Sequence, residues 1–155
     1  MALIATGNNN QTEQKIIEND GFFPDIHLVQ ARDTMRVDGT VTSARLIEAL
    51  VTAILYVNQA LSLWKKAQQD KGYATLISIP AQKIGKESAQ LHHYRRAVYS
   101  SAMADLAERY RNFDSTKSGH QQAQALEEPI DDHRRNAQWA LNDMMNCPRS
   151  TVALI

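Results

Sequence analysis

The amino-acid sequence predicts a mainly α-helical protein, an antiparallel bundle of about three long helices with a short helix before it and an extended tail or strand after it. Three long segments carry apolar residues at three- and four-residue spacing, the period of an amphipathic helix, and polar breaks separate them. The 155 residues, 43% of them hydrophobic, suffice for one core but not for two. We therefore divide the chain into a flexible arm over residues 1–20, a helical bundle over 21–147 and an extended tail over 148–155.

The N-terminal part of the chain changes character at a pair of aromatic residues. Residues 6–20 are polar and contain a run of asparagines, a composition that buries too little apolar surface to offset the entropy of ordering. Phe22 and Phe23 then precede Pro24, which fits the first turn of a helix. We expect a short helix from there to about Met35, with the aromatic pair pinning its start to the bundle.

The first long helix should begin after Thr42, a good N-cap, and end near Asp70, ahead of Gly72. Its core face follows helical spacing over Leu46, Leu50, Ala53, Val57, Leu61 and Trp64. Further apolar residues widen this face until the first half of the helix is apolar nearly all round. We assign these residues, together with the aromatic pair, to a subunit interface, with a place in the core as the alternative: Phe22, Phe23, Ile47, Val51, Ile54 and Leu55.

Two more long helices are expected, over about residues 86–112 and 120–146, after an ordered connection over 72–85. Pro129 removes a backbone donor inside the last of them, so we expect a kink there or two shorter helices. The predicted core of the whole bundle consists of Leu46, Leu50, Val57, Leu61, Trp64, Tyr94, Val98, Leu106, Tyr110 and Trp139.

The last residues after Pro148 are unusually aliphatic for a chain terminus. Three large aliphatic side chains in five residues are a poor composition for a solvated end. We predict that this tail anchors the chain on a partner or on a neighbouring copy, through Arg149, Ser150, Thr151, Val152, Leu154 and Ile155.

Charge and cysteine content exclude several classes of protein. The 17 Lys and Arg balance the 17 Asp and Glu, so the chain offers no long-range attraction to nucleic acid or anionic lipid. One cysteine, Cys147, forms no intramolecular disulfide, which favours a reducing compartment such as a bacterial cytoplasm. We expect no signal peptide and no membrane span.

Candidate chemical sites are weak. His92 and His93 are helical neighbours that point about 100° apart and do not chelate one ion unaided. The acidic run around Pro129 and the arginine pairs at 95–96 and 134–135 are better explained as solvated, ion-paired helix faces. Cys147 has no recognisable general-base partner, and no nucleotide-binding loop is present. We expect no catalytic residue, metal or cofactor.

Several blocks of the sequence, in order from residue 22 to residue 155, form a recognisable series. The blocks are FFPD at 22–25, MRVDGTVT at 35–42, YRRAVY at 94–99, ERYRNFD at 108–114, Arg134-Arg135 with Trp139, and PRSTVALI at 148–155. They closely resemble the GPL-type head completion proteins of Peduovirus-like tailed phages. His27, where an acidic residue is expected, and Pro129 are departures from the pattern.

The resemblance implies a non-enzymatic adaptor at the head-tail junction, or neck, of a virion, assembled in the cytoplasm of the bacterial host. It implies a homo-oligomeric ring of about twelve copies that docks on the portal protein after packaging, stabilises the filled head and offers a surface to a tail-side neck protein. Genomic double-stranded DNA would pass through the ring. The tail residues 150–155 would then anchor on the portal or a neighbour.

Two other classes remain open from the residues alone. A small helical DNA-binding regulator would use the arginine pairs, although the neutral charge argues against it. A metal hydrolase would use the histidine pair or the acidic run.

Overall fold

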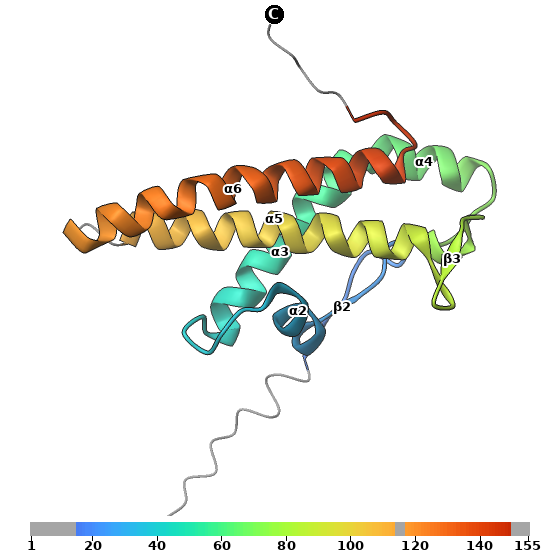
Figure 1. Ribbon diagram of the computed structural model, residues 1–155. Helices are drawn as coiled ribbons and strands as arrows, with labels where there is room; N and C mark the ends of the chain where they lie inside the picture. The colour runs from blue at the N-terminus through green and yellow to red at the C-terminus, as the bar shows by residue number, and fades with distance from the viewer. Residues whose placement is uncertain (1–14, 114–116, 150–155) are drawn as a thin grey trace, which may run out of the picture.

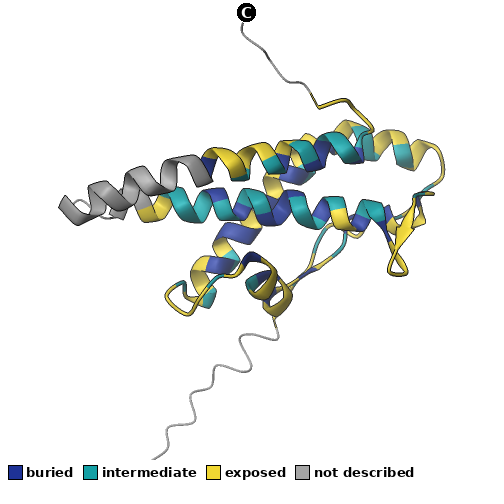
Figure 2. Ribbon diagram, in the orientation of Figure 1, coloured by how far each residue is buried: buried dark blue, intermediate teal, exposed yellow. Residues whose placement is uncertain are grey.

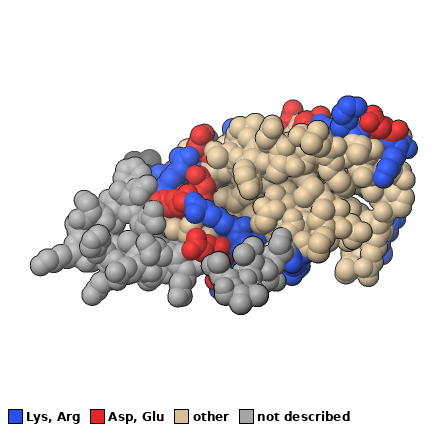
Figure 3. Space-filling view, turned by 90° about the horizontal axis from the view of Figure 1, so that it is seen from above, with Lys and Arg blue, Asp and Glu red and all other residues tan. Residues whose placement is uncertain are grey.

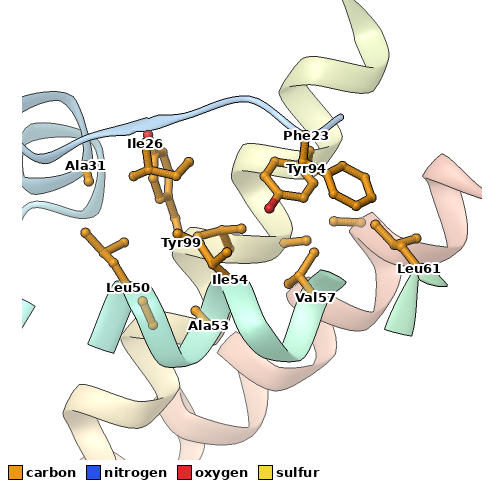
Figure 4. Close-up of a cluster of buried hydrophobic side chains, with 14 of the residues drawn as sticks. Phe23, Ile26, Ala31, Leu50, Ala53, Ile54, Val57, Leu61, Tyr94 and Tyr99 are labelled. Atoms are coloured by element: carbon orange, nitrogen blue, oxygen red, sulfur yellow. The ribbon is translucent and has the colours of Figure 1, made fainter. Parts of the chain in front are cut away.

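Two long helices form a hairpin, and a third crosses it at a steep angle (Figures 1 and 4). The structure, a computed structural model, describes residues 15–113 and 117–149, with the backbone alone for 111–113 and 117–129. In this part of the chain the protein is mainly helical, as the sequence predicts. The helices are α2 (Leu28–Met35), α3 (Ser43–Ala60), α4 (Ser62–Asp70), α5 (Ala89–Phe113) and α6 (Lys117–Met144).

The hairpin consists of α5 and α6, which run side by side along most of their length (Figure 1). The expected division of the last helix at Pro129 is not found, because α6 is one helix from Lys117 to Met144. The third long helix, α3, packs mainly on α5 and crosses it rather than running alongside.

The N-terminal part of the fold begins earlier than predicted. Strand β1 (Ile16–Ile17) pairs antiparallel with β2 (Ile26–His27), and Ile17 packs against the core. The backbone amide of Leu28 also donates to the carbonyl oxygen of Lys15 over 3.0 Å. The predicted flexible arm is therefore too long: residues 15–20 are part of the fold, and residues 1–14 lie outside the described part.

The predicted helix from Thr42 to Asp70 is two helices. Its start is confirmed, since the Thr42 hydroxyl accepts a hydrogen bond from the Arg45 amide at 3.3 Å. The helix breaks at Leu61, whose φ of −95° and ψ of 4° turn α4 by 58° from α3. The wholly buried Leu61 anchors this bend in the core, and the bend directs Lys65 of α4 toward Asp20.

A short hairpin replaces the predicted first turn of the second long helix. Strands β3 (Lys83–Ile84) and β4 (Glu87–Ser88) pair across Gly85 and Lys86, which have φ values of 58° and 68°. A two-residue turn of this kind needs positive φ at both positions, so Lys86 belongs to the turn. Helix α5 consequently begins at Ala89.

The core lies between α3 and α5, with α2, the β1–β2 ribbon and the last turns of α6 closing its sides (Figures 2 and 4). Six of the ten predicted core residues are buried in it: Leu46, Leu50, Val57, Leu61, Tyr94 and Val98. Trp64, Leu106 and Trp139 are only half-buried. Tyr110, in the last turns of α5, is 47% exposed, and its hydroxyl donates to Oγ1 of Thr40 at 3.4 Å.

Candidate interaction surfaces

The aromatic pair that was predicted at a subunit interface belongs to the core instead. Phe22 and Phe23 are both buried, and their rings meet edge to face with centroids 5.0 Å apart. The Phe23 ring also stacks on Tyr94 at 4.7 Å, with the two planes only 9° apart (Figure 4). These contacts hold the N-terminal ribbon on α5.

A closed set of hydrogen bonds sits at the edge of this aromatic cluster. The Tyr94 hydroxyl donates to Oδ1 of Asn58 at 2.7 Å and accepts from Nδ2 of Asn19 at 2.7 Å, while Nδ2 of Asn58 donates to Oδ1 of Asn19 at 2.9 Å. Burial raises the pKa of Tyr94 well above its usual range. This network was not predicted, because it joins three segments that are far apart along the chain.

Asp20 fixes the backbone at Phe22 and Phe23. Its carboxylate accepts from the backbone amides of Phe22 and Phe23, each at 3.0 Å, and from Nζ of Lys65 at 2.6 Å. Partial burial alone would raise the pKa of Asp20, but the Lys65 and backbone hydrogen bonds lower it below the ordinary value. Asp20 thus fixes the ribbon to α4.

The exposed face of α3 is the apolar surface that the sequence predicted in part. Val51 is 36% and Leu55 67% exposed, and Glu48 and Thr52 are exposed beside them. We call Glu48, Val51, Thr52 and Leu55 the α3 outer strip. The prediction was wrong for Ile54, which is buried in the core, and Ile47 is half-buried against it. Adjacent helical residues point about 100° apart, so Ile54 faces the core while its neighbour Leu55 faces outward.

Exposed apolar side chains continue beyond the strip. Tyr56 is 53% exposed and Leu63, in α4, is 82% exposed. Figure 3 looks down onto α6 and α4 and shows two groups of charged side chains, one beside the grey residues and one at the opposite end, with a broad region of uncharged residues between them. Exposed apolar surface of this kind marks interaction sites in soluble proteins.

A groove opens between α2, α5 and α6, and no residue of α3 lines it. Its volume is about 420 Å³. We call it the α2–α5 groove; its main lining side chains are Met35, Arg95, Arg96, Tyr99, Met103 and His133. Sequence reasoning missed this groove, because its walls come from three separate helices.

A second groove of about 390 Å³ lies between α3, α5 and α6, with Tyr56, Ala104 and Ala137 in its walls. Arg134 and Glu108 form an ion pair across it. Arg135 forms an ion pair with Asp132 at 2.8 Å, so both arginines at 134–135 are in ion pairs.

The base of the C-terminal tail is held on α6. Nε and Nη2 of Arg149 donate to the two carboxylate oxygens of Asp143 at 3.3 and 2.8 Å. The guanidinium groups of Arg149 and Arg135 both lie against the Trp139 ring, 4.8 and 5.0 Å from its centroid. We call these four residues the tail root. The hydrogen bond from Arg149 lowers the pKa of Asp143 below its ordinary value. The predicted anchor residues 150–155 lie outside the described part of the chain.

Candidate chemical centres find little geometric support. Within the described residues, no group of three or more His, Cys, Asp or Glu side chains could hold a metal ion. The rings of His92 and His93 lie 5.9 Å apart and edge to face. Among the helices described, none alone is long and apolar enough to cross a membrane; only the bent pair α3 and α4 passes by length and composition together.

Comparison with known proteins agrees with the sequence blocks. The family model of the phage head completion protein (GPL) matches residues 17–155. The chain belongs to this family. It is also 34% identical over 143 residues to the head completion/stabilization protein of Escherichia phage P2, an alignment covering 92% of this chain and 85% of the phage P2 protein. No solved structure matches the chain.

Family membership confirms the resemblance and places the chain among structural proteins of phage particles. Nearly the whole described structure falls within the matched range, from Ile17 of β1 to the tail root. Within the described residues, the candidate interaction surfaces are the α3 outer strip, the α2–α5 groove and the tail root.

Proposed function

We propose that this head completion protein is an adaptor of the phage neck. It forms a ring of about twelve copies on the portal protein after DNA packaging, stabilises the filled head and joins it to a tail-side neck protein, with genomic DNA passing through the lumen. The ring assembles in the host cytoplasm. The observation that carries the proposal is the match to the GPL family over residues 17–155.

The exposed apolar surface of α3 and α4 supports contacts between copies. A ring presses each subunit against two neighbours, so a subunit needs apolar side chains that its own core does not use. Val51, Leu55 and Leu63 are such side chains. Covering Leu55 and Leu63 would contribute about 1.5 to 3 kcal/mol each, before the cost of association.

The tail supports attachment to the portal or a neighbouring subunit. Burying Val152, Leu154 and Ile155 would contribute about 1.5 to 3 kcal/mol each, and ordering the backbone of residues 151–155 would cost about 1 to 2 kcal/mol per residue. A single tail is therefore close to break-even. Once the first tail of a ring has docked, the other tails bind at high effective concentration. A ring should therefore bind the portal much more tightly than a single subunit does.

Charge favours a channel over a DNA-binding regulator. Three of the four arginines that such a regulator would use are in close ion pairs: Arg95 with Glu87 at 3.1 Å, Arg134 with Glu108 and Arg135 with Asp132. A balanced charge also suits a wall along which DNA must slide, since a strongly basic wall would hold phosphates.

The experiment is a mass measurement of the protein alone and after mixing with the portal of its phage. We expect a portal complex that carries about one copy of this chain per portal subunit. Tight, salt-sensitive binding to duplex DNA without any portal complex would instead support the regulator and overturn the adaptor.

A further inference from the structure

The α3 outer strip has the residue pattern of a helix that docks in a groove. Glu48, Val51 and Leu55 stand at positions i, i+3 and i+7, which bring them to one face of α3. All three are exposed, and Glu48 has no ion pair among the described residues. The strip therefore offers two aliphatic side chains followed, toward the N-terminus, by one unpaired carboxylate.

The α2–α5 groove has the complementary chemistry. Met35 and Met103 give it apolar walls, and flexible methionine side chains adapt to an incoming surface. Two arginines and two histidines line it, and no acidic side chain does so among the described residues. The groove is thus suited to an apolar segment that carries a negative charge.

Arg96 is the cation of the groove with unused binding capacity. Arg95 is already paired with Glu87 at 3.1 Å. The nearest carboxylate oxygen to Arg96, on Asp143, is 3.8 Å away, and Arg149 binds that same oxygen at 2.8 Å. A further carboxylate beside Arg96 would therefore complete its hydrogen bonding.

Tyr99 brings a polar group to the wall of the groove. Its side chain lines the groove and is only 7% exposed, yet its hydroxyl has no hydrogen-bond partner among the described residues. Buried polar groups without a partner are uncommon, and each calls for a missing water or ligand group.

We propose that the α2–α5 groove binds the α3 outer strip of a second copy of this chain, with Glu48 beside Arg96 and Val51 and Leu55 on the methionine walls. No residue of α3 lines the groove, so the two surfaces are distinct and the contact is head to tail. Such contacts continue from copy to copy, and they close into a ring where the rotation between neighbours returns to the first copy. This inference rests on the proposed ring and names the two surfaces that build it.

The test reverses the two charges in the full chain. Glu48→Arg and Arg96→Glu should each weaken association between neighbours by about tenfold or more, because each puts like charges together. Either variant should still bind the portal through its tail, but fewer copies should bind to each portal than with the unaltered chain. The mass of the complex measures that number. An equal mixture of the two variants should restore full rings, since both kinds of contact in an alternating ring then pair opposite charges.

Matched controls are Glu18→Arg and Arg109→Glu, which make the same charge changes at exposed positions outside both surfaces. They should assemble like the unaltered chain. Full rings from either single variant, or no recovery in the mixture, would overturn the proposed contact. Failure of the unaltered chain to bind the portal would instead overturn the adaptor function itself.

Arg96→Glu places a carboxylate near Asp143, so a second measurement guards against a folding defect. In a Cys147→Ser background, Glu48→Cys with Arg96→Cys in one chain should give a ladder of disulfide-linked oligomers when portal-bound rings are oxidised. The single cysteine variants should stay monomeric on a denaturing gel, because position 48 does not meet its own copy in a head-to-tail contact. Absence of the ladder from fully occupied rings would contradict the contact.

Discussion

The Tyr94 hydroxyl donates a hydrogen bond to Oδ1 of Asn58 over 2.7 Å, at the edge of the core. The two residues belong to α5 and α3, and Asn19 completes the set from the N-terminal ribbon. One wholly buried phenol therefore ties three segments together through its oxygen, while its ring stacks on Phe23. A buried network whose polar groups are all paired also specifies how the segments dock.

Tyr94→Phe removes this oxygen and little else. Oδ1 of Asn58 and one N–H of Asn19 lose their partner, so we expect the free energy of unfolding to fall by about 1 to 3 kcal/mol. Urea denaturation followed by circular dichroism measures the change. Tyr56→Phe, at a side chain that is 53% exposed, is the matched control and should leave the midpoint where it was. Equal midpoints for both variants would show that the network contributes nothing.

Asp20→Ala should also destabilise the fold, although Asp20 lies in a segment that composition alone predicts to be flexible. The substitution leaves the amides of Phe22 and Phe23 and the Lys65 ammonium without their acceptor. We expect a loss of about 0.5 to 2 kcal/mol, the range for the loss of a capping side chain, since the group is partly solvated. The control is Glu18→Ala, two residues away and exposed. If protease cleaves residues 15–20 of both variants at the same rate, the ribbon is not held by Asp20.

The helices were predictable because their apolar spacing is a local signal. Leu46, Leu50 and Val57 repeat along one face of α3 whatever else the chain does, and Thr42 caps its own helix. The bend at Leu61 was not predictable, because the apolar spacing continues through it. The bend brings Lys65 of α4 against Asp20 of the N-terminal ribbon, a contact between segments that are distant in sequence.

The candidate site shows the same division. The helical period predicts that Val51 and Leu55 share one face of α3, and both are exposed. Ile54, one residue before Leu55, is buried instead, and its burial depends on the position of α5, which the sequence does not show. Phe22 and Phe23 could not be distinguished from surface aromatics until Tyr94 was placed beside them. The α2–α5 groove, with walls from three helices, has no signature along the chain.

Acid should destabilise the protein in two stages. Burial lowers the pKa values of His93 and His133 below the usual 6.5, despite the nearby carboxylates of Asp143 and Asp132 respectively. The unfolded chain then binds protons more readily, so stability begins to fall as pH drops below about 6.5. Arg96, Arg149 and His92 around His93 oppose its protonation further.

The second stage belongs to carboxylates whose folded pKa is lowered, such as Asp143 and Asp20. Their contribution is present above the unfolded pKa near 3.8 and is lost as pH falls through the lower folded value. Thermal melting from pH 7.5 to 3 measures both stages. His93→Gln with His133→Gln should flatten the curve between pH 7 and 5 and leave the second stage in place. An unchanged slope in the upper range would show that the two imidazoles do not cause the first stage.

Arg149→Ala should uncouple folding from attachment to the head. Arg149 binds Asp143 and lies on Trp139, and this holds the base of the tail against α6. Because the Arg149 side chain is 46% exposed, solvent screens its ion pair and we expect little change in the unfolding midpoint. Tail binding should weaken severalfold, because residues 150–155 then search a wider volume before they dock. The measurement is the number of filled heads that keep their DNA when the variant is supplied to phage lacking the native protein.

Deletion of residues 150–155 sets the limit for that assay, since it should leave a folded helical protein that no longer joins portals. Arg149→Lys is the conservative variant: it keeps the charge near Asp143 but loses the planar contact with Trp139, so it should fall between Arg149→Ala and the unaltered chain. Normal head completion by the truncated chain would show that the tail is not the anchor. Normal completion by Arg149→Ala alone, with the truncated chain inactive, would show that the tail docks without help from its root.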